Sequence, residues 1–271
     1  MSKKYTIRNH VVFGLVMRRP NIAKRCLETI LGKKITKLNI IETEKSEEVS
    51  PDIHGVRFDV YCENEDTVYD VELQAYEITD LGKRTRYYQD MMDMTLLEKG
   101  EPYSSLKKNI VIFICTFDPY EKGRHLYSFG NRCEQDASVK LDDGTTKIIL
   151  NTKGTIDDIP KELKLFLDYI ETDKVLDSYT REVDNAVKEI QNDKRWRANI
   201  MTFEQVIKDA AFQAKNEGKA EGKAEGKAEG ISEEKKETVS LMIKMGEFSD
   251  DTICKIVDLS SDELDRIKES L

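Results

Sequence analysis

The chain has 271 residues, of which 39% are hydrophobic and 35% are charged, and its formal net charge at pH 7 is −9. This length allows one substantial domain with smaller additions. The longest apolar stretch, Ile110 to Cys115, is far shorter than the ~20 residues of a membrane-spanning helix, so we expect no such helix.

The cysteines and the first residues indicate a cytoplasmic protein. The five cysteines never form a C-x-x-C pair, as expected for reduced thiols, and the three histidines lack zinc-ligand spacing. The first eight residues contain no apolar segment of the kind that a secretory signal requires. We therefore expect a cytoplasmic location and no membrane partner.

The negative charge is concentrated at the C-terminal end. From Asn216 onward the sequence contains 15 acidic and 9 basic residues, whereas the preceding residues contain 37 acidic and 34 basic ones. A nearly neutral region can still bind a polyanion, because the ligand meets a local basic patch and not the net charge. The composition therefore permits nucleic-acid binding without favouring it.

The first predicted elements are a helix and a strand. Apolar residues at helical spacing predict a helix over 21–31 that ends at Gly32, and alternation over 34–41 predicts a strand. A polar loop should then continue through Pro51.

The segments 56–62 and 67–74 predict the two strands of a β-hairpin. Both alternate and are rich in Val, Phe and Tyr, and polar residues separate them. We expect Glu65 and Asp66 to form a two-residue loop, which fixes the register of the strands. The pairs on one face are then Arg57 with Gln74, Asp59 with Glu72, and Tyr61 with Asp70.

In this register the polar pairs lie on one face of the hairpin, and apolar side chains lie on the other. We expect the apolar face to be buried. Its side chains are Phe58, Val60, Cys62, Val71, Leu73 and Ala75. On the polar face, like charges directly opposite each other destabilise a sheet unless something lies between them. A divalent cation between Asp59 and Glu72 is the obvious candidate.

Helix and strand patterns continue after the hairpin. Asp80 is a suitable N-cap for a helix that runs to Lys99 and ends at Gly100. The apolar run 109–117 predicts a strand covered on both faces, and 126–133 and 146–150 predict further strands around an Asp-Asp-Gly turn. From Asp158 onward the spacing is helical. This order predicts a mixed α/β fold.

The motifs Arg57-Phe58-Asp59 and Glu72-Leu73-Gln74 resemble the metal centre of the PD-(D/E)XK nucleases. Over about two-thirds of its length the chain also resembles one branch of them, the recombination-promoting (Rpn) nucleases, often described as transposase-like. The further segments that carry this resemblance are Asn9-His10-Val11-Val12-Phe13-Gly14, Arg84-Thr85-Arg86-Tyr87-Tyr88, Gly100-Glu101-Pro102-Tyr103 and Ile110-Val111-Ile112-Phe113-Ile114. Two departures stand out: no Pro precedes Asp59, and Gln74 occupies the position of the usual Lys.

The resemblance implies a restriction-endonuclease-like core with added strands and a helical C-terminal extension. It also implies a DNA endonuclease that uses Mg²⁺, with Mn²⁺ as the alternative ion. Asp59, Glu72 and the backbone carbonyl of Leu73 would hold the metal. Gln74 would orient the attacking water, because an amide does not accept a proton at neutral pH.

Charged residues near the hairpin have two interpretations each. Asp70 is either a further ligand or an ordinary charge near the hairpin end, and we favour the second. Arg57 either positions the substrate or neutralises nearby carboxylates. Lys83, Arg84 and Arg86 open the next helix, where they either contact phosphates or form a solvated face.

The domains predicted from these patterns are a nuclease-like core over 1–155, a helical extension over 156–215, a Glu-Gly-Lys-Ala repeat over 216–232, and a small helical tail over 233–271. The repeat is either a solvated linker, which we favour, or a helix with a stripe of Gly and Ala. In the tail, Ser249 and Ser260 should start two short helices, the second with a capping box to Glu263.

The tail resembles a helix-turn-helix, but its last helix is acidic. An interaction or dimerisation module, and hence a homo-oligomer, is therefore the better interpretation. Two other classes of function stay open beside the endonuclease. One is a catalytically inactive PD-(D/E)XK scaffold that binds nucleic acid or protein, because the usual Lys is missing. The other is an assembly protein driven by the tail.

Overall fold

The structure is a computed structural model that describes residues 5–47, 55–194 and 233–270, together with the isolated positions 212, 218, 219 and 223. It contains two compact units, Met1–Ile200 and Met201–Leu271. The Glu-Gly-Lys-Ala repeat lies almost entirely outside the described residues, so the choice between linker and helix stays a prediction. None of the described helices combines the length and apolar character needed to cross a membrane.

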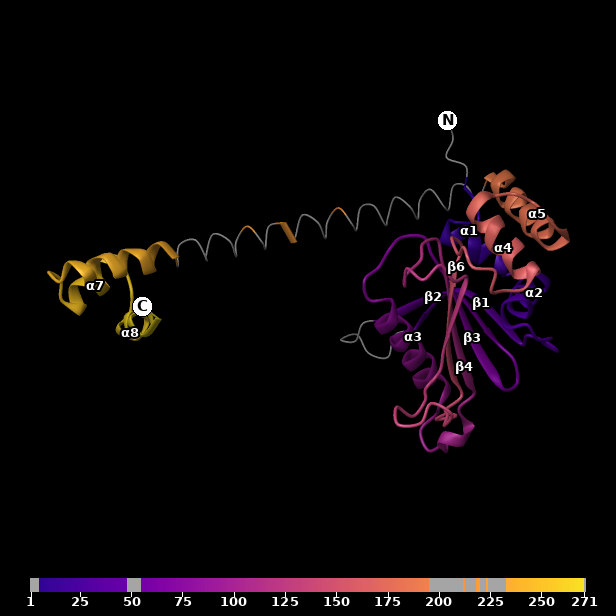
Figure 1. The fold of residues 1–271 in the computed structure, drawn as a ribbon, viewed down its shortest axis with the longest axis horizontal. Coiled ribbons are helices and arrows are strands. Elements are labelled where there is room, and N and C mark those ends of the chain that lie inside the picture. Colours follow the sequence, from indigo (N-terminus) through magenta and orange to yellow (C-terminus); the bar gives the residue numbers. More distant parts are fainter. Residues whose placement is uncertain are drawn as a thin grey trace. The chain divides into compact units, whose positions relative to one another are not determined.

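In the described part of the first unit, six strands form one mixed sheet in the order β1-β2-β3-β4-β6-β5. Figure 1 shows this sheet together with its helices. The strands are β1 Ile40–Glu47, β2 Val56–Glu63, β3 Thr67–Gln74, β4 Lys108–Cys115, β5 Leu126–Phe129 and β6 Thr145–Asn151. The pairs β1–β2, β2–β3 and β5–β6 are antiparallel, whereas β4 is parallel to both β3 and β6. The predicted mixed α/β fold is confirmed.

Helices cover both faces of this sheet. The helices of the unit are α1 His10–Met17, α2 Pro20–Leu31, α3 Leu81–Leu96, α4 Lys161–Thr172 and α5 Ser178–Asn192, with a short 3₁₀ turn η1 at Tyr103–Ser105. Along β4, Ile110, Ile112 and Ile114 share one hydrophobic core with α1, α2, α4 and α5. The alternate residues Val111 and Phe113 share the other core with α3. The strand is thus buried on both faces, as its apolar run predicts.

The helix over 21–31 is confirmed as α2, and Gly32 ends it in the left-handed conformation, with φ of 63°. Helix α3 follows Asp80 as predicted but ends at Leu96, before Lys99. Helix α1 is not predicted from the sequence, although Asn9 caps it by accepting hydrogen bonds from the backbone N–H groups of Val11 and Val12.

The prediction of a strand over 34–41 is wrong in its bounds. The strand begins at Ile40 and runs through the polar segment to Glu47, where we expected a loop. Among the described strands it lies at the edge of the sheet and pairs with β2, and edge strands tolerate such charged side chains. The preceding residues form a loop in which Ile35 is buried and donates its N–H to Glu28 Oε1 at 2.9 Å.

The hairpin register is confirmed at the turn. Asn64 N donates to the Thr67 carbonyl at 2.9 Å, which leaves a two-residue loop, and Tyr61 pairs with Asp70. The apolar face is buried as expected, with Val60, Cys62, Val71 and Leu73 in one core. The polar face is buried as well, because α3 covers it.

Phe58 departs from its predicted face. It belongs to the core beneath α3, with its ring centroid 5.4 Å from that of Tyr88, whereas Val60 packs in the opposite core. The alternation of β2 therefore breaks at Asp59, between these two residues. A break in the pleat redirects a side chain, and here it lies at the predicted metal ligand.

The second unit contains helical residues 233–245 followed by α7 Asp250–Val257 and α8 Ser261–Ser270. A small apolar core joins them: Val239, Met242, Ile253, Val257, Leu264 and Ile267. The capping box is confirmed, because Ser260 N donates to Glu263 Oε2 at 2.8 Å and Glu263 N donates back to Ser260 Oγ at 3.3 Å.

Candidate functional site

Asp59 and Glu72 are held against each other by backbone N–H groups. The described β2–β3 ladder ends at the pair Val60–Val71, one position before these two residues. Beyond it, Asp59 N donates to Glu72 Oε1 at 2.7 Å, and Leu73 N donates to Asp59 Oδ2 at 3.0 Å. Side-chain oxygens thus replace backbone carbonyls as acceptors, and both carboxylates are fixed at the junction of the two strands.

Helix α1 closes the back of this junction. Gly14 lies in that helix, and a Cβ there would be 3.4 Å from the backbone oxygen of Asp59, at the lower limit of ordinary van der Waals contact. Helix α1 therefore packs directly against the backbone of β2 at the site. The two strands are supported from behind by a rigid element, as a preorganised site requires.

The carboxylates at this junction are almost completely buried. The exposed fractions are 8% for Asp59, 3% for Glu72 and 0% for Asp70. Burial, together with the negative charge of Asp59, raises the pKa of Glu72 to about 8. Burial and the neighbouring Glu72 raise the pKa of Asp70 well above its usual range. The surroundings therefore stabilise less negative charge than three ionised carboxylates would carry.

Asp70 differs most from the sequence interpretation. We favoured an ordinary charge near the hairpin end, and the structure instead buries the side chain completely beside Glu72. Neither of its carboxylate oxygens has a hydrogen-bond partner within the described part of the chain. An orphaned buried carboxylate is costly, which is the behaviour expected of a group that awaits a proton or a cation.

Gln74 and Arg84 meet next to the carboxylates. Arg84 Nη1 donates to Gln74 Oε1 at 3.2 Å, and Nη2 lies 3.6 Å from Glu72 Oε2. Gln74 Nε2 donates to the Tyr76 carbonyl at 2.7 Å. Gln74 lies where the sequence predicts it. For Arg84 the sequence leaves open a phosphate contact or a solvated helix face, and its contact with Glu72 is neither of these.

An open cleft of about 880 Å³ leads to these residues. Asp59, Glu72, Leu73 and Gln74 line its floor together with Arg84. Other basic residues that line the cleft are Arg8, His10, Arg57, Lys83 and Arg86. The structure thus brings every residue proposed for the site from the sequence into one cleft, and it adds the exposed ring of Tyr76.

The donor set suits a hard divalent cation. Asp59 and Glu72 offer carboxylate oxygens, and Asp70 adds a buried carboxylate without a donor. In an extended strand the N–H and C=O of one residue point to the same side, so the Leu73 carbonyl faces β2, as its N–H does. Within the described ranges, however, no group of three or more His, Cys, Asp or Glu is already arranged as a metal site.

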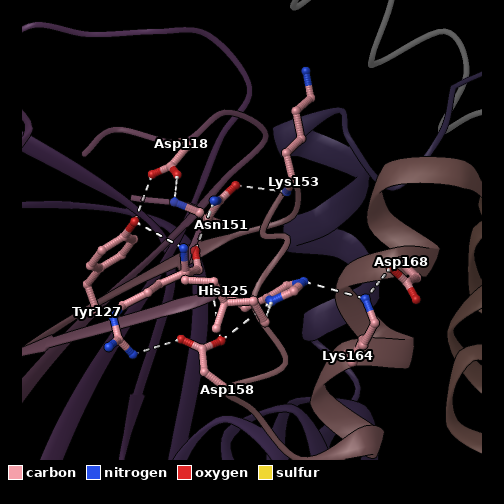
Figure 2. Close-up of polar contacts among 11 residues, drawn as sticks. Asp118, His125, Tyr127, Asn151, Lys153, Asp158, Lys164 and Asp168 are labelled. Atoms are coloured by element: carbon pink, nitrogen blue, oxygen red, sulfur yellow. Dashed lines mark hydrogen bonds and ion pairs between the residues drawn. The ribbon is translucent and has the colours of Figure 1, made fainter. Parts of the chain in front are cut away.

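A second polar cluster lies on β5, β6 and α4 and has a different character (Figure 2). His125 is buried, with Nδ1 2.7 Å from the Ile156 carbonyl and Nε2 3.5 Å from Lys164 Nζ. Its backbone N–H donates to Asp158, which also pairs with Arg124. Each carboxylate here has donors from the chain itself, so the cluster fastens the sheet edge to α4 and does not need a ligand.

A family model described as PD-(D/E)XK nuclease family transposase matches residues 13–177, which is more than half of the chain. No curated protein and no solved structure matches the chain. Nucleases of this family are typically phosphodiesterases that use divalent metal ions. The match confirms the resemblance drawn from the hairpin motifs and the restriction-endonuclease-like fold class.

Proposed function

The chain belongs to the PD-(D/E)XK nuclease family transposases, and from this premise we propose that it is a magnesium-dependent DNA endonuclease that hydrolyses phosphodiester bonds. Manganese is the alternative ion. The observation that carries the proposal is the pair of buried carboxylates, Asp59 and Glu72, each of which accepts a backbone N–H from the opposite strand, and both of which line an open cleft. If no ligand bound between Asp59 and Glu72, this buried like-charge pair would lower the stability of the protein without serving a function.

Asp59, Glu72 and the carbonyl of Leu73 would hold the ion. A bound divalent cation supplies activation of water and stabilisation of the charge that develops on a phosphate. Asp70 is buried beside Glu72, where burial and the neighbouring carboxyl groups raise its pKa, so a cation would relieve the repulsion among these groups. Gln74 cannot serve as a base, because its amide does not take up a proton near neutral pH.

Gln74 can still position a reactant. Its oxygen accepts from Arg84, and its nitrogen donates one hydrogen to the Tyr76 carbonyl. An amide nitrogen carries two hydrogens, so the second one can donate to a water molecule or a phosphate oxygen. We assign Gln74 an orienting role in the cleft, which predicts an intermediate loss of rate when it is removed.

DNA would enter along the basic rim of the cleft. Arg57, Lys83 and Arg86 line it, and the last two are exposed on the first turns of α3. Cationic side chains around an acidic floor let the phosphate backbone approach although the chain as a whole is acidic. The matched family supports DNA as the polymer.

A catalytically inactive scaffold is the alternative function. Two observations favour it: the amide of Gln74 replaces a charged amine, and no three-residue metal cluster is preformed among the described side chains. In that case the same cleft would bind nucleic acid or protein without cutting it. Metal-dependent cleavage separates the two functions.

The tail supports a separate proposal of self-association. In the second unit, Leu241 and Met245 lie one helical turn apart and are 62% and 64% exposed, and Phe248 is also exposed. An apolar stripe of this kind is typical of an interface. Deleting 216–271 should then convert an oligomer into a monomer in sedimentation, and an unchanged oligomeric state would exclude the tail, including the tail-driven assembly function.

Purified protein on supercoiled plasmid tests the main proposal. Nicked or linear DNA should appear with magnesium and disappear with a chelator, and Asp59→Ala should produce neither. The matched control is Asp90→Ala, which removes an exposed carboxylate from α3. Equal cutting by wild type and Asp59→Ala would place the nuclease elsewhere, and a folded wild type that never cuts would favour the scaffold.

A further inference from the structure

Arg84 differs from the other basic residues of the cleft because it turns inward. Lys83 and Arg86 flank it on α3 and are exposed, whereas Arg84 is only partly accessible and contacts three residues. Its guanidinium donates to Gln74 Oε1 at 3.2 Å and to the Tyr88 hydroxyl at 2.8 Å, and it lies 3.6 Å from Glu72 Oε2. One planar group thus links β3 to α3.

Aromatic rings fix the position of this guanidinium. Its carbon lies 5.2 Å from the ring centroid of Tyr88 and 5.6 Å from that of Phe113. Tyr88 is itself buried and packs edge-on against both Phe58 and Phe113. A stacked and forked arginine loses little freedom when it binds, so the charge is preorganised beside Glu72.

The arginine also determines which way the Gln74 amide points. A guanidinium has only donors, so the amide atom that faces Arg84 must be the oxygen. The nitrogen is then directed toward the Tyr76 carbonyl, with which it makes a 2.7 Å hydrogen bond. The Tyr76 carbonyl only accepts, so it imposes the same orientation from the other side, and Arg84 supplies one of the two contacts that hold the amide.

We infer that Arg84 is the positioning residue of the site: it supplies a fixed positive charge from α3, steadies the Glu72 carboxylate, and holds the oxygen of the Gln74 amide so that the second N–H of that amide stays available to the reactants. The inference rests on the proposed nuclease function for its kinetic consequence, but the orientation of Gln74 stands apart from activity. A solvated helix face, the simpler interpretation, would leave the guanidinium without these contacts. A phosphate grip would place it at the rim with Lys83 and Arg86.

The kinetic test compares Arg84→Ala with Arg86→Ala on plasmid DNA under single-turnover conditions. Arg84→Ala should lower the rate at saturating DNA by on the order of 100-fold, as for loss of a preorganised electrostatic group, with less than about a threefold change in DNA affinity. Arg86→Ala should mainly weaken affinity. Arg181→Ala, on the exposed surface of α5, controls for loss of an arginine in itself.

Arg84→Lys and the double variant sharpen the test. A lysine restores charge but not the fork, so it should recover only part of the rate. Arg84→Ala combined with Gln74→Ala should cost little more than Arg84→Ala alone, because both act through one contact. Additive losses would overturn the inference, as would an Arg84→Ala variant that loses affinity and keeps its saturated rate. If Arg84→Ala does not fold, the rate and DNA affinity of Arg84→Lys are compared with those of Arg86→Ala instead.

A measurement without turnover keeps this test separate from the nuclease itself. The side-chain amide signal of Gln74 in an NMR spectrum, assigned by its absence in Gln74→Ala, should shift in Arg84→Ala and stay in place in Arg181→Ala. An unmoved signal in folded Arg84→Ala would overturn the positioning role whether or not wild type cuts DNA. A shifted signal in an inert wild type would retain the role and reject the nuclease.

Discussion

The carboxylates of the hairpin and those of the β5–β6 edge have opposite surroundings. Asp118 is partly buried, which raises its pKa, but hydrogen bonds from the Gly123 and Tyr120 N–H groups and the Tyr127 hydroxyl outweigh burial and lower it overall. At the hairpin, burial and like charges raise the pKa of Asp70 and of Glu72. The chain stabilises charge at one cluster and leaves it unbalanced at the other.

This difference separates scaffold from function. A carboxylate that only holds the fold together is surrounded by donors, as Asp118 is (Figure 2). A carboxylate that binds a cation has too few hydrogen-bond donors and positive charges around it until the cation is bound. This lack lowers the stability of the fold without the ligand. The contrast also explains why we assign no catalytic role to His125, although it lies beside a carboxylate and a lysine.

The largest effect should come from Asp59→Ala. Plasmid cleavage should fall to the uncatalysed background, because the cation loses a ligand and with it the activation of water. In contrast, Asp118→Asn should leave the cleavage rate of the remaining folded protein unaltered, since that carboxylate serves the scaffold. A gel assay of nicked and linear plasmid gives both rates, and similar losses from both variants would contradict the comparison.

Gln74→Ala should have an intermediate effect. We expect single-turnover cleavage to slow by about 10- to 1000-fold, as for the loss of one positioning hydrogen bond. Gln74→Lys should retain or increase activity, because it restores the commoner family residue. Complete loss in Gln74→Ala with intact magnesium binding would instead mean that the amide takes part in the chemistry.

The hairpin shows which structural features could be predicted from the sequence and which could not. Alternation and a two-residue loop were sufficient to align the strands, and the pairing of Tyr61 with Asp70 confirms that register. The face of Phe58 and the depth of Asp70 were not predictable in this way, because they depend on a break in β2 and on how α3 packs. Similarly, nothing local distinguishes Arg84 from Arg86, since only tertiary packing turns one of them inward.

Edge position explains the misplaced first strand. An edge strand needs little apolar surface, so Ile40–Glu47 looks like a loop in the sequence, whereas the buried β4 was recognised from its apolar run. The division at residue 155 stays a prediction. In the structure, α4 and α5 share a hydrophobic core with α1 and α2.

Asp70→Asn should stabilise the folded protein by about 0.5–2 kcal/mol at pH 8. The raised pKa values mean that the folded state binds more protons than the unfolded chain, so this cluster destabilises the fold increasingly as pH rises from the ordinary 4.5 of Glu72 toward about 8. The gain should therefore shrink as the pH falls. Urea unfolding at several pH values measures it, and a variant less stable than wild type at pH 8 would contradict the assignment.

Asp118→Asn should have the opposite sign and cost about 1–2 kcal/mol at neutral pH. Because the pKa of Asp118 is lowered from 3.8, its contribution is present above that value and is lost as pH falls through the lowered pKa. The difference between wild type and variant should thus vanish in acid. A difference that grows toward low pH would reverse the comparison between the two clusters.

The smallest effect is expected for the exposed basic residues that line the cleft. Replacing Lys83 and Arg86 together with Ala should reduce the dependence of DNA affinity on salt by about 0.9 log units per lost phosphate contact. Filter binding over a range of salt concentrations gives the slope. An unchanged slope would assign both side chains to a solvated helix face.

Magnesium binding in the absence of DNA tests the central claim most directly. Titration calorimetry should show a single ion bound per wild-type chain, with a raised melting temperature, because the cation offsets the repulsion among the hairpin carboxylates. Asp59→Ala should lose this binding, and Asp118→Asn should keep it. Equal binding by wild type and Asp59→Ala, or a folded wild type that neither binds nor is stabilised by magnesium, would contradict the account.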